Sequence, residues 1–446
     1  MDVLKKFRPV YLLIGVVLSA LLAYGLWTTP TPQPADAEGF SSARVVEDIK
    51  VISQKHHSVA PEHAENRAEV REYIAGRLQA LGADTLKRFR YDSLQGPDPL
   101  KKHLTEPYVF DAENLLAEFH PLIESEDTTY LMFVAHYDSR YSQPMPKDTV
   151  WSYGAADDGY GVGVTLETVS QLLKNRKDWK QGVKVLFTDA EEVGMMGMKA
   201  MWKNDKDVFS DVGLMINLEA RGTYGPALLF ETCPGNEKIM DLYADAARYP
   251  YTYSLTTVVY NFMPNFTDFT IVKDYIPGIN FSTITDVNHY HTDKDNFSNI
   301  SQKSIQHYGE QILPIAQEYL TNAEYADKDY FRAEEDTVNF TVPVLGLFNF
   351  SKTVYMVINI VVFLLFLLVF GLEKVRGRLK SPVGVLKVSG IILGSAIGTL
   401  LVGELIAYVC AAIAGAKFNL LGVVQGCQFD KTGNQRNWWT AEDKAN

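Results

Sequence analysis

Five side chains of the kinds that bind zinc stand in five separate motifs of this 446-residue chain. Each motif lies where an apolar run gives way to polar residues, as at the end of a buried strand. The five are His136 in AHYDS, Asp157 in GAADDGYGVG, Glu192 in TDAEEVGMMG, Glu219 in NLEARG and His291 in HYHTDKDN. Zinc binds imidazole nitrogens and carboxylate oxygens, and two zinc ions can share a carboxylate in a hydrolytic site. The sequence therefore predicts a site for two zinc ions and metal-assisted hydrolysis.

Two positions beside these residues suit supporting roles. In a hydrolytic site, a carboxylate that does not bind metal can take a proton from water and pass it to the leaving amine. The adjacent Glu191 and Glu192 suit this division, with one bound to metal and its neighbour free. Asp138 follows His136 by two residues, and such residues share a face at a strand end. A metal-bound histidine commonly donates its second N–H to a carboxylate, so Asp138 is either that acceptor or a loop-capping aspartate.

The segments that must position these residues have recognisable patterns. Continuously apolar runs at 131–135, 183–187, 214–218 and 276–281 are typical of strands buried on both faces. Residues 65–81 and 161–173 have the apolar spacing of helices. Strands that alternate with helices predict an α/β fold with a mostly parallel central sheet sandwiched by helices. Ligands bind such sheets at the carboxyl ends of the strands, where the five motifs lie.

The composition excludes some partners and sites. The net charge of −12 argues against binding of nucleic acid, which needs a basic surface. The three cysteines form no CxxC motif, so a thiolate zinc site is not expected. The partners expected are peptide substrates and membrane lipid.

Three stretches are apolar enough to cross a bilayer, which takes about 20 residues. Residues 9–27 could instead form a signal peptide cleaved near Ala35, but the apolar run is longer than a typical signal core, so an uncleaved anchor is favoured. The other two stretches are 354–372 and 388–415, and the loop between them is basic, which predicts that it lies in the cytoplasm. The third stretch carries small residues that allow helix–helix contact, namely Gly390, Gly394 and Gly398.

Taken in order, HYDS, GAADDG, DAEEVGMMG, NLEARG and YHTDKD resemble the co-catalytic di-zinc exopeptidases of metallopeptidase family twenty-eight, over roughly residues 40–321. The family's soluble members commonly have aspartate where this chain has Glu219, and NLEARG is similar to the membrane-anchored vacuolar-type branch. The resemblance implies two zinc ions per chain. It places one on His136, Asp157 and Glu219 and the other on Asp157, Glu192 and His291, with Asp157 bridging.

The resemblance also implies roles for residues that do not bind metal. Glu191 would be the general base and acid, and Tyr290 would help to stabilise the oxyanion. Asp268, in a segment that is similar to a pocket-lining part of the family, would face the substrate's amino group or serve a turn.

The apolar stretches, the basic loop and the resemblance together set the expected domain order and location. The order is a cytoplasmic tip and transmembrane anchor (1–28), a proline-rich linker expected to be unstructured (29–39), a zinc peptidase domain (40–325), a linker (326–352), a transmembrane helix (353–372), a basic cytoplasmic loop (373–387), a transmembrane helix (388–415) and a C-terminal tail (416–446). The peptidase domain would face away from the cytoplasm. Two spans after that domain are fewer than in long eukaryotic members, which favours a bacterial cell membrane over a vacuolar membrane.

The leading hypothesis is a membrane-anchored aminopeptidase. A non-catalytic receptor built on a peptidase scaffold is the alternative from another class, although such relatives typically lose ligands or the base. A carboxypeptidase would need a cation for the substrate's terminal carboxylate, for which Arg221 is a candidate. A glutaminyl cyclase of the same fold would work with one zinc.

Overall fold

The computed structural model describes residues 29–95, 109–123, 128–140, 143–144, 149–263, 265–342 and 345–377, with isolated residues between 10 and 18 and between 384 and 398. The chain divides into two compact units, residues 1–349 and 350–446. The expected first and third spans and the C-terminal tail lie outside the described residues, apart from those isolated positions.

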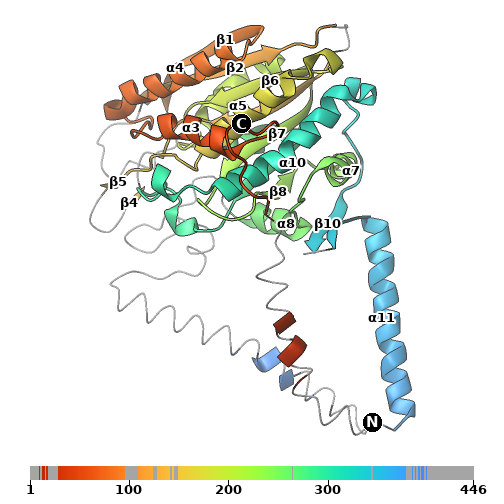
Figure 1. Cartoon of the computed structure of the whole chain (residues 1–446). Helices are drawn as coiled ribbons and strands as arrows, with labels where there is room; N and C mark the ends of the chain where they lie inside the picture. The colour runs from red at the N-terminus through yellow and green to blue at the C-terminus, as the bar shows by residue number, and fades with distance from the viewer. Residues whose placement is uncertain are drawn as a thin grey trace. The chain divides into compact units, whose positions relative to one another are not determined.

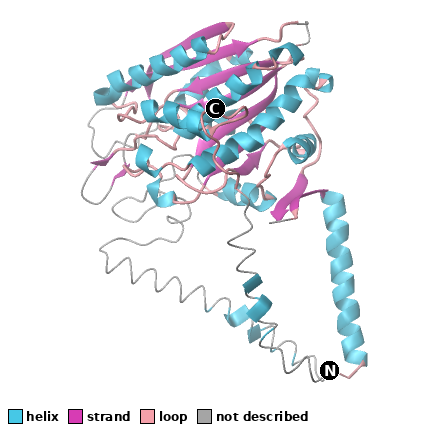
Figure 2. Cartoon of the chain, viewed as in Figure 1, coloured by secondary structure: helices cyan, strands magenta, loops and turns pink. Residues whose placement is uncertain are grey.

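The first unit is built on a seven-stranded sheet with the order β1-β2-β6-β3-β7-β9-β8 (Figures 1 and 2). Its strands are β1 (Thr85–Gln95), β2 (Val109–Phe119), β3 (Tyr130–His136), β6 (Gly182–Thr188), β7 (Val212–Ala220), β8 (Leu228–Thr232) and β9 (Gly278–Thr283). The neighbours β6, β3, β7 and β9 are parallel, whereas β1, β2 and β8 join by antiparallel pairing. The sheet is therefore mixed, and the expected parallel arrangement holds only for its four central strands.

The four central strands are the four apolar runs of the sequence. Every residue of β3, β6 and β9 is buried, and so is every residue of β7. Strands covered on both faces have no solvent-facing side, so their sequences do not alternate between apolar and polar residues. The strand predicted from Ile276 begins at Gly278, because Pro277 has no N–H to donate to a ladder.

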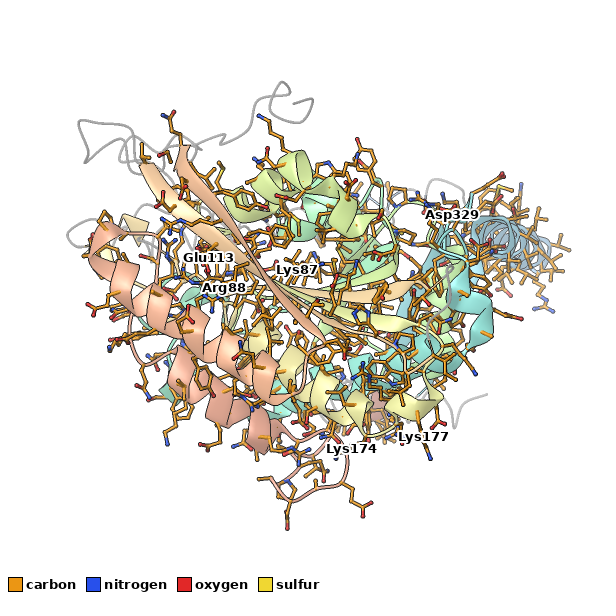
Figure 3. All side chains as sticks on the ribbon, turned by 90° about the horizontal axis from the view of Figure 1, so that it is seen from above. Lys87, Arg88, Glu113, Lys174, Lys177 and Asp329 are labelled. Carbon is orange, nitrogen blue, oxygen red and sulfur yellow. The ribbon has the colours of Figure 1, made fainter. Side chains whose placement is uncertain are left out.

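Helices cover both faces of this sheet (Figure 3). Helices α3 (Ser42–Ile52), α5 (Gly159–Leu173) and α10 (Gln302–Thr321) pack against one another, and α5 contacts β3 and β7. Helices α6 (Met196–Asn204) and α9 (Asp268–Val272) also contact each other, with α6 beside β1 and β2. Within residues 29–349, the structure also describes the α-helices α4 (Ala64–Ala80), α7 (Glu237–Ala246) and α8 (Ser254–Phe262). The helices predicted over 65–81 and 161–173 are confirmed as α4 and α5.

Strand β1 is an edge strand, and its polar sequence reflects that position. It pairs with β2 along its length, where Arg88 donates to the Glu113 carboxylate at 3.2 Å (Figure 3). On the same strand Lys87 forms an ion pair with Glu118 at 3.1 Å. Cross-strand pairs of opposite charge favour this register, and lysine on an edge discourages pairing with another chain.

Two segments expected to be linkers have hydrogen-bonded structure. In the proline-rich segment, the backbone N–H of Gln33 donates to Gln306 of α10, and the guanidinium of Arg44 donates to the carbonyls of Ala35 and Ala37. These hydrogen bonds give the segment a fixed course without helix or strand. The segment 326–352 contains β10 (Thr337–Val342) and β11 (Gly346–Ser351), which pair with each other. A further small pair joins β4 (Gln143–Pro144) to β5 (Thr149–Val150).

The second unit contains α11 (Lys352–Val375), a helix of 24 residues. Among the described residues it is the one helix long and apolar enough to cross a bilayer. Its length is about 36 Å, compared with about 30 Å for the hydrocarbon layer of a membrane.

Candidate metal centre

The carboxyl ends of the four central strands meet at one edge of the sheet and bring the five predicted ligands together. His136 ends β3, Glu219 lies one residue before the end of β7, and Glu192 follows β6. Asp157 precedes α5, and His291 follows the turn after β9. Each of the five is at most 9% exposed. Side chains distant along the chain thus converge where the parallel topology predicts.

The ligand atoms form two groups of three that share Asp157. One group is His136, Asp157 and Glu219, and the other is Asp157, Glu192 and His291; within each, the ligand atoms lie within 4.8 Å of one another. His136 Nε2 lies 3.1 Å from Asp157 Oδ1 and 3.8 Å from Glu219 Oε2. His291 Nε2 lies 3.3 Å from Asp157 Oδ2 and 2.9 Å from Glu192 Oε2. The two oxygens of Asp157 therefore face different histidines.

The loop that carries Asp157 is held by two aspartates that the sequence analysis did not identify. Asp158 is the N-cap of α5 and accepts the Gly161 N–H at 2.9 Å. Asp295 accepts the backbone N–H groups of Ala156, at 2.7 Å, and of Asp157, at 3.2 Å. Burial, and then the charge of Asp157, raise the pKa of Asp295 to about 7. Asp295 is the last residue of the YHTDKD motif, but the groups that it contacts could not be predicted from the sequence.

Asp138 lies beneath both His136 and the loop that carries the two adjacent glutamates. Its carboxylate accepts the backbone N–H of Glu191 at 2.9 Å and of Glu192 at 3.3 Å. The ring nitrogen Nδ1 of His136 lies 3.5 Å from this carboxylate but 2.9 Å from the Asp138 carbonyl oxygen. The shorter contact makes the carbonyl the better acceptor of the histidine N–H. The expected partner residue is therefore in place, while its carboxylate mainly holds the loop.

Glu191 lies beside both groups without belonging to either. It is partly buried, and its carboxylate is close enough to Glu219 and His136 to interact electrostatically with both. Burial, followed by the charge of Glu219, raises the pKa of Glu191 well above its usual value. A carboxylate in this position can exchange a proton with a molecule held between the two groups.

Tyr290 stacks on His291, with ring centroids 3.5 Å apart. The guanidinium carbon of Arg221 lies 5.2 Å from the centre of the Tyr290 ring, and Arg221 Nη2 donates to Asn265 Oδ1 at 2.7 Å. Burial, and then the charge of Asp157, raise the pKa of Tyr290 well above its usual value, so its hydroxyl stays protonated as a donor. The backbone of His291 has φ +57°, a left-handed conformation that is uncommon for a non-glycine residue and is often found at functional sites.

Asp268 is the first residue of α9 and is buried. Thr188, at the end of β6, donates its hydroxyl to Asp268 Oδ2, while Oδ1 has no hydrogen-bond partner among the described residues. Burial raises the pKa of Asp268 to about 6. Asp268 adds a further acid to the side of the site where Glu191 and Glu219 lie.

The residues present fit a pair of cations. Within the described part of the chain, Asp157 Oδ2, Glu192 Oε1 and His291 Nε2 are buried without a well-directed hydrogen bond, although His291 and Glu192 are close together. Burial raises the pKa of both Glu192 and Glu219, and the charge of nearby Asp157 raises both pKa values further. Buried acids that face imidazole nitrogens and leave oxygens unsatisfied are the donor set that zinc prefers.

Comparison with known proteins supports this interpretation. Residues 114–316, which include all five predicted ligands, match the family described as Peptidase family M28. The family resemblance seen in the sequence is thereby confirmed. The chain is 28% identical over 278 residues to endoplasmic reticulum metallopeptidase 1 of Mus musculus, and 26% identical over 333 residues to the vacuolar membrane protease of Candida tropicalis.

These matches cover 61% and 73% of this chain, but only 30% and 33% of the two relatives. The chain thus matches about a third of each relative's length.

Two solved structures are similar at a lower level of sequence identity. Porphyromonas gingivalis glutaminyl cyclase has a TM-score of 0.49 at 19% identity and covers 64% of this chain and 100% of its own. A leucine aminopeptidase precursor from Bacteroides thetaiotaomicron has a TM-score of 0.49 at 18% identity and covers 63% of this chain and 97% of its own.

Proposed function

We propose that this chain, whose residues 114–316 match peptidase family M28, is a membrane-anchored metallo-exopeptidase that holds two zinc ions. The observation that carries the proposal is the sharing of Asp157 by two groups of three buried ligands. His136 and Glu219 would complete one zinc site, and Glu192 and His291 would complete the other.

The reaction proposed is hydrolysis of a peptide bond. Zinc, when bound, would supply a Lewis acid for the scissile carbonyl and lower the pKa of a nearby water. The Glu191 carboxylate would accept the proton of that water and pass it to the leaving amine. Asp138 would hold Glu191 in place through its backbone N–H, and the Tyr290 hydroxyl would donate to the developing oxyanion.

The substrate proposed is a peptide with a free N-terminus. The centre is rich in acidic side chains, including Asp268, and their negative charge is complementary to the ammonium group of such a peptide. The guanidinium of Arg221 is already engaged by Asn265 and the Tyr290 ring, which gives less support for a site that binds a C-terminal carboxylate. Aminopeptidase activity is therefore favoured over carboxypeptidase activity.

A peptide library tests this proposal. The full chain in detergent would be incubated with free and N-acetylated peptides, with and without a chelator. We expect stepwise release of N-terminal residues from free peptides only, and loss of activity with the chelator. Release from the C-terminus, cyclisation of N-terminal glutamine, or no turnover by zinc-loaded protein would contradict the aminopeptidase assignment; the last result would favour a receptor.

Membrane anchoring through α11 is part of the proposal. The two curated relatives are named for the endoplasmic reticulum and the vacuolar membrane, which supports membrane association here. By the distribution of basic residues, the loop 373–387 would lie in the cytoplasm and the peptidase domain on the opposite side of the membrane. Single cysteines would be introduced at Lys177 and at Lys374 of a chain whose three native cysteines are replaced by serine. Labelling by a membrane-impermeant reagent tests this arrangement: only the first should react in intact cells.

A further inference from the structure

A row of polar residues crosses three neighbouring strands directly beside Glu219. Asn217 on β7 pairs in register with Asn280 on β9, and Asn280 pairs with Glu231 on β8. All three side chains have 0% exposure in a sheet whose core is otherwise largely apolar. Burial of amides and a carboxylate is costly unless their polar atoms find partners. Among the described residues, every side-chain polar atom of the row except Asn217 Oδ1 has one.

The contacts form a directed chain. Asn217 Nδ2 donates to Glu219 Oε1 and to Asn280 Oδ1, both at 3.0 Å. Asn280 Nδ2 donates to Glu231 Oε2 at 3.1 Å and to Thr267 Oγ1 at 2.9 Å. Because a carboxylate only accepts hydrogen bonds, Glu219 and Glu231 fix which end of each amide is the NH2 group.

The row ends on a cation. Lys273 Nζ lies 2.7 Å from Glu231 Oε1, and the lysine side chain is 20% exposed whereas that of Glu231 is fully buried. The ion pair compensates the buried charge of Glu231, since an unpaired carboxylate there would be strongly unfavourable. The orientation of Glu231, and through it of Asn280, therefore depends on Lys273.

The row forms a hydrogen bond with one oxygen of Glu219, and the other oxygen faces the metal centre. Glu219 Oε1 is held by Asn217, while Oε2 faces His136 Nε2 at 3.8 Å. A glutamate has three side-chain torsions, so a free Glu219 would lose rotamer freedom when it binds a metal. A carboxylate already fixed by a hydrogen bond loses less, and partners of this kind tune metal affinity.

We propose that Asn217, Asn280 and Glu231 form a positioning row that holds the Glu219 carboxylate for metal binding, with Lys273 as its outer support. The inference rests on the proposed function, because it assigns Glu219 to a zinc site. The same row reaches Thr267, the N-cap of the helix that begins with Asp268, so it braces two acids of the centre from one set of hydrogen bonds.

Zinc affinity tests the row without using catalysis as the readout. The dissociation constant would be measured on the full chain in detergent by competition with a chromophoric chelator. Asn217→Leu removes both donors at similar volume, and we expect it to weaken zinc binding by about 10- to 100-fold. Gln311→Met is the matched control: Gln311 is an equally buried amide that bonds Tyr243 and the Ala227 carbonyl, away from the centre, and its loss should leave the affinity unchanged.

A second pair of variants covers the case in which Asn217→Leu does not fold. Lys273→Met should weaken zinc binding, whereas Lys273→Arg, which keeps the charge, should restore it to the wild-type value. Unchanged affinity in Asn217→Leu, or in Lys273→Met where Asn217→Leu does not fold, would overturn the positioning role whatever the melting temperature of the variant. Wild-type protein that takes up no zinc would instead contradict the proposed function on which the inference rests.

Discussion

The carboxylate of Asp138 accepts the backbone N–H of Glu191 at 2.9 Å, so one buried aspartate ties the end of β3 to the residue proposed as general base. The same carboxylate also accepts the N–H of Glu192 at 3.3 Å. The loop that carries both the proposed base and a proposed ligand is therefore fixed from beneath, and an active site needs this kind of support to keep its geometry.

Asp138→Asn should disturb that loop, because an amide NH2 group would face one of the two backbone N–H groups. We expect kcat/KM to fall about 10- to 100-fold while zinc content is retained. The control is Asp336→Asn, the same substitution in a different loop, where one oxygen, Asp336 Oδ1, accepts the backbone N–H groups of Gly235 and Asn236. Equal losses of activity in the two variants would show that the effect of Asp138 is only structural.

Glu191→Gln should keep both zinc ions and lose turnover. The amide cannot accept the water's proton, so kcat should fall by about 10²- to 10⁴-fold. Zinc content measured on the same preparation separates this effect from loss of metal. Activity close to wild type in a zinc-loaded Glu191→Gln protein would exclude Glu191 as the base.

Tyr290→Phe should lower kcat with little change in zinc content, because it removes only the hydroxyl proposed to donate to the oxyanion. The expected loss is about 10²-fold, as for other single oxyanion donors. Tyr275→Phe, at an exposed tyrosine beside Trp202, provides the control. A change confined to KM would place Tyr290 in substrate binding instead.

The buried ring of His307 should make the fold less stable in acid, independently of the metal centre. Its ring is buried and neutral, accepting the Ala227 N–H at 2.8 Å and contacting the Tyr249 carbonyl at 3.0 Å. Burial lowers its pKa from 6.5 to about 4. The unfolded chain therefore takes up the proton first, so stability present above pH 6.5 is lost as the pH falls toward 4, by about 2 kcal/mol at pH 5.

The measurement for His307 is the change in melting temperature between pH 7 and pH 5. His307→Gln can keep both hydrogen bonds but has no titrating ring, so its melting temperature should fall less than that of the wild type over this interval. An identical fall in both proteins would mean that other groups dominate the acid sensitivity.

The sequence predicts the central strands of the sheet better than the edge strand β1 and the segment that contains β10 and β11. Strands β3 and β6 are recognisable because strands buried on both faces are continuously apolar. Strand β1, with the sequence TLKRFRYDSLQ, lacks that signal, because its solvent-facing edge position permits charged residues that pair across to β2. The segment 326–352 is likewise expected to be a linker, although it supplies β10 and β11.

In the site, too, some residues are predictable from the sequence and others are not. The types of the five ligands and their places at strand ends suffice to predict that they converge. The supports of those ligands depend on which residues face each other across strands, and a sequence does not contain that register. Asn217 and Asn280 lie 63 residues apart and meet only because β7 and β9 pair with this alignment.

Anomalous X-ray diffraction at the zinc absorption edge, on crystals of the full chain grown with zinc, tests the central claim most directly. The account predicts two anomalous peaks per chain, one enclosed by His136, Asp157 and Glu219 and the other by Asp157, Glu192 and His291. One peak, no peak, or peaks held by other side chains would contradict a two-metal centre bridged by Asp157.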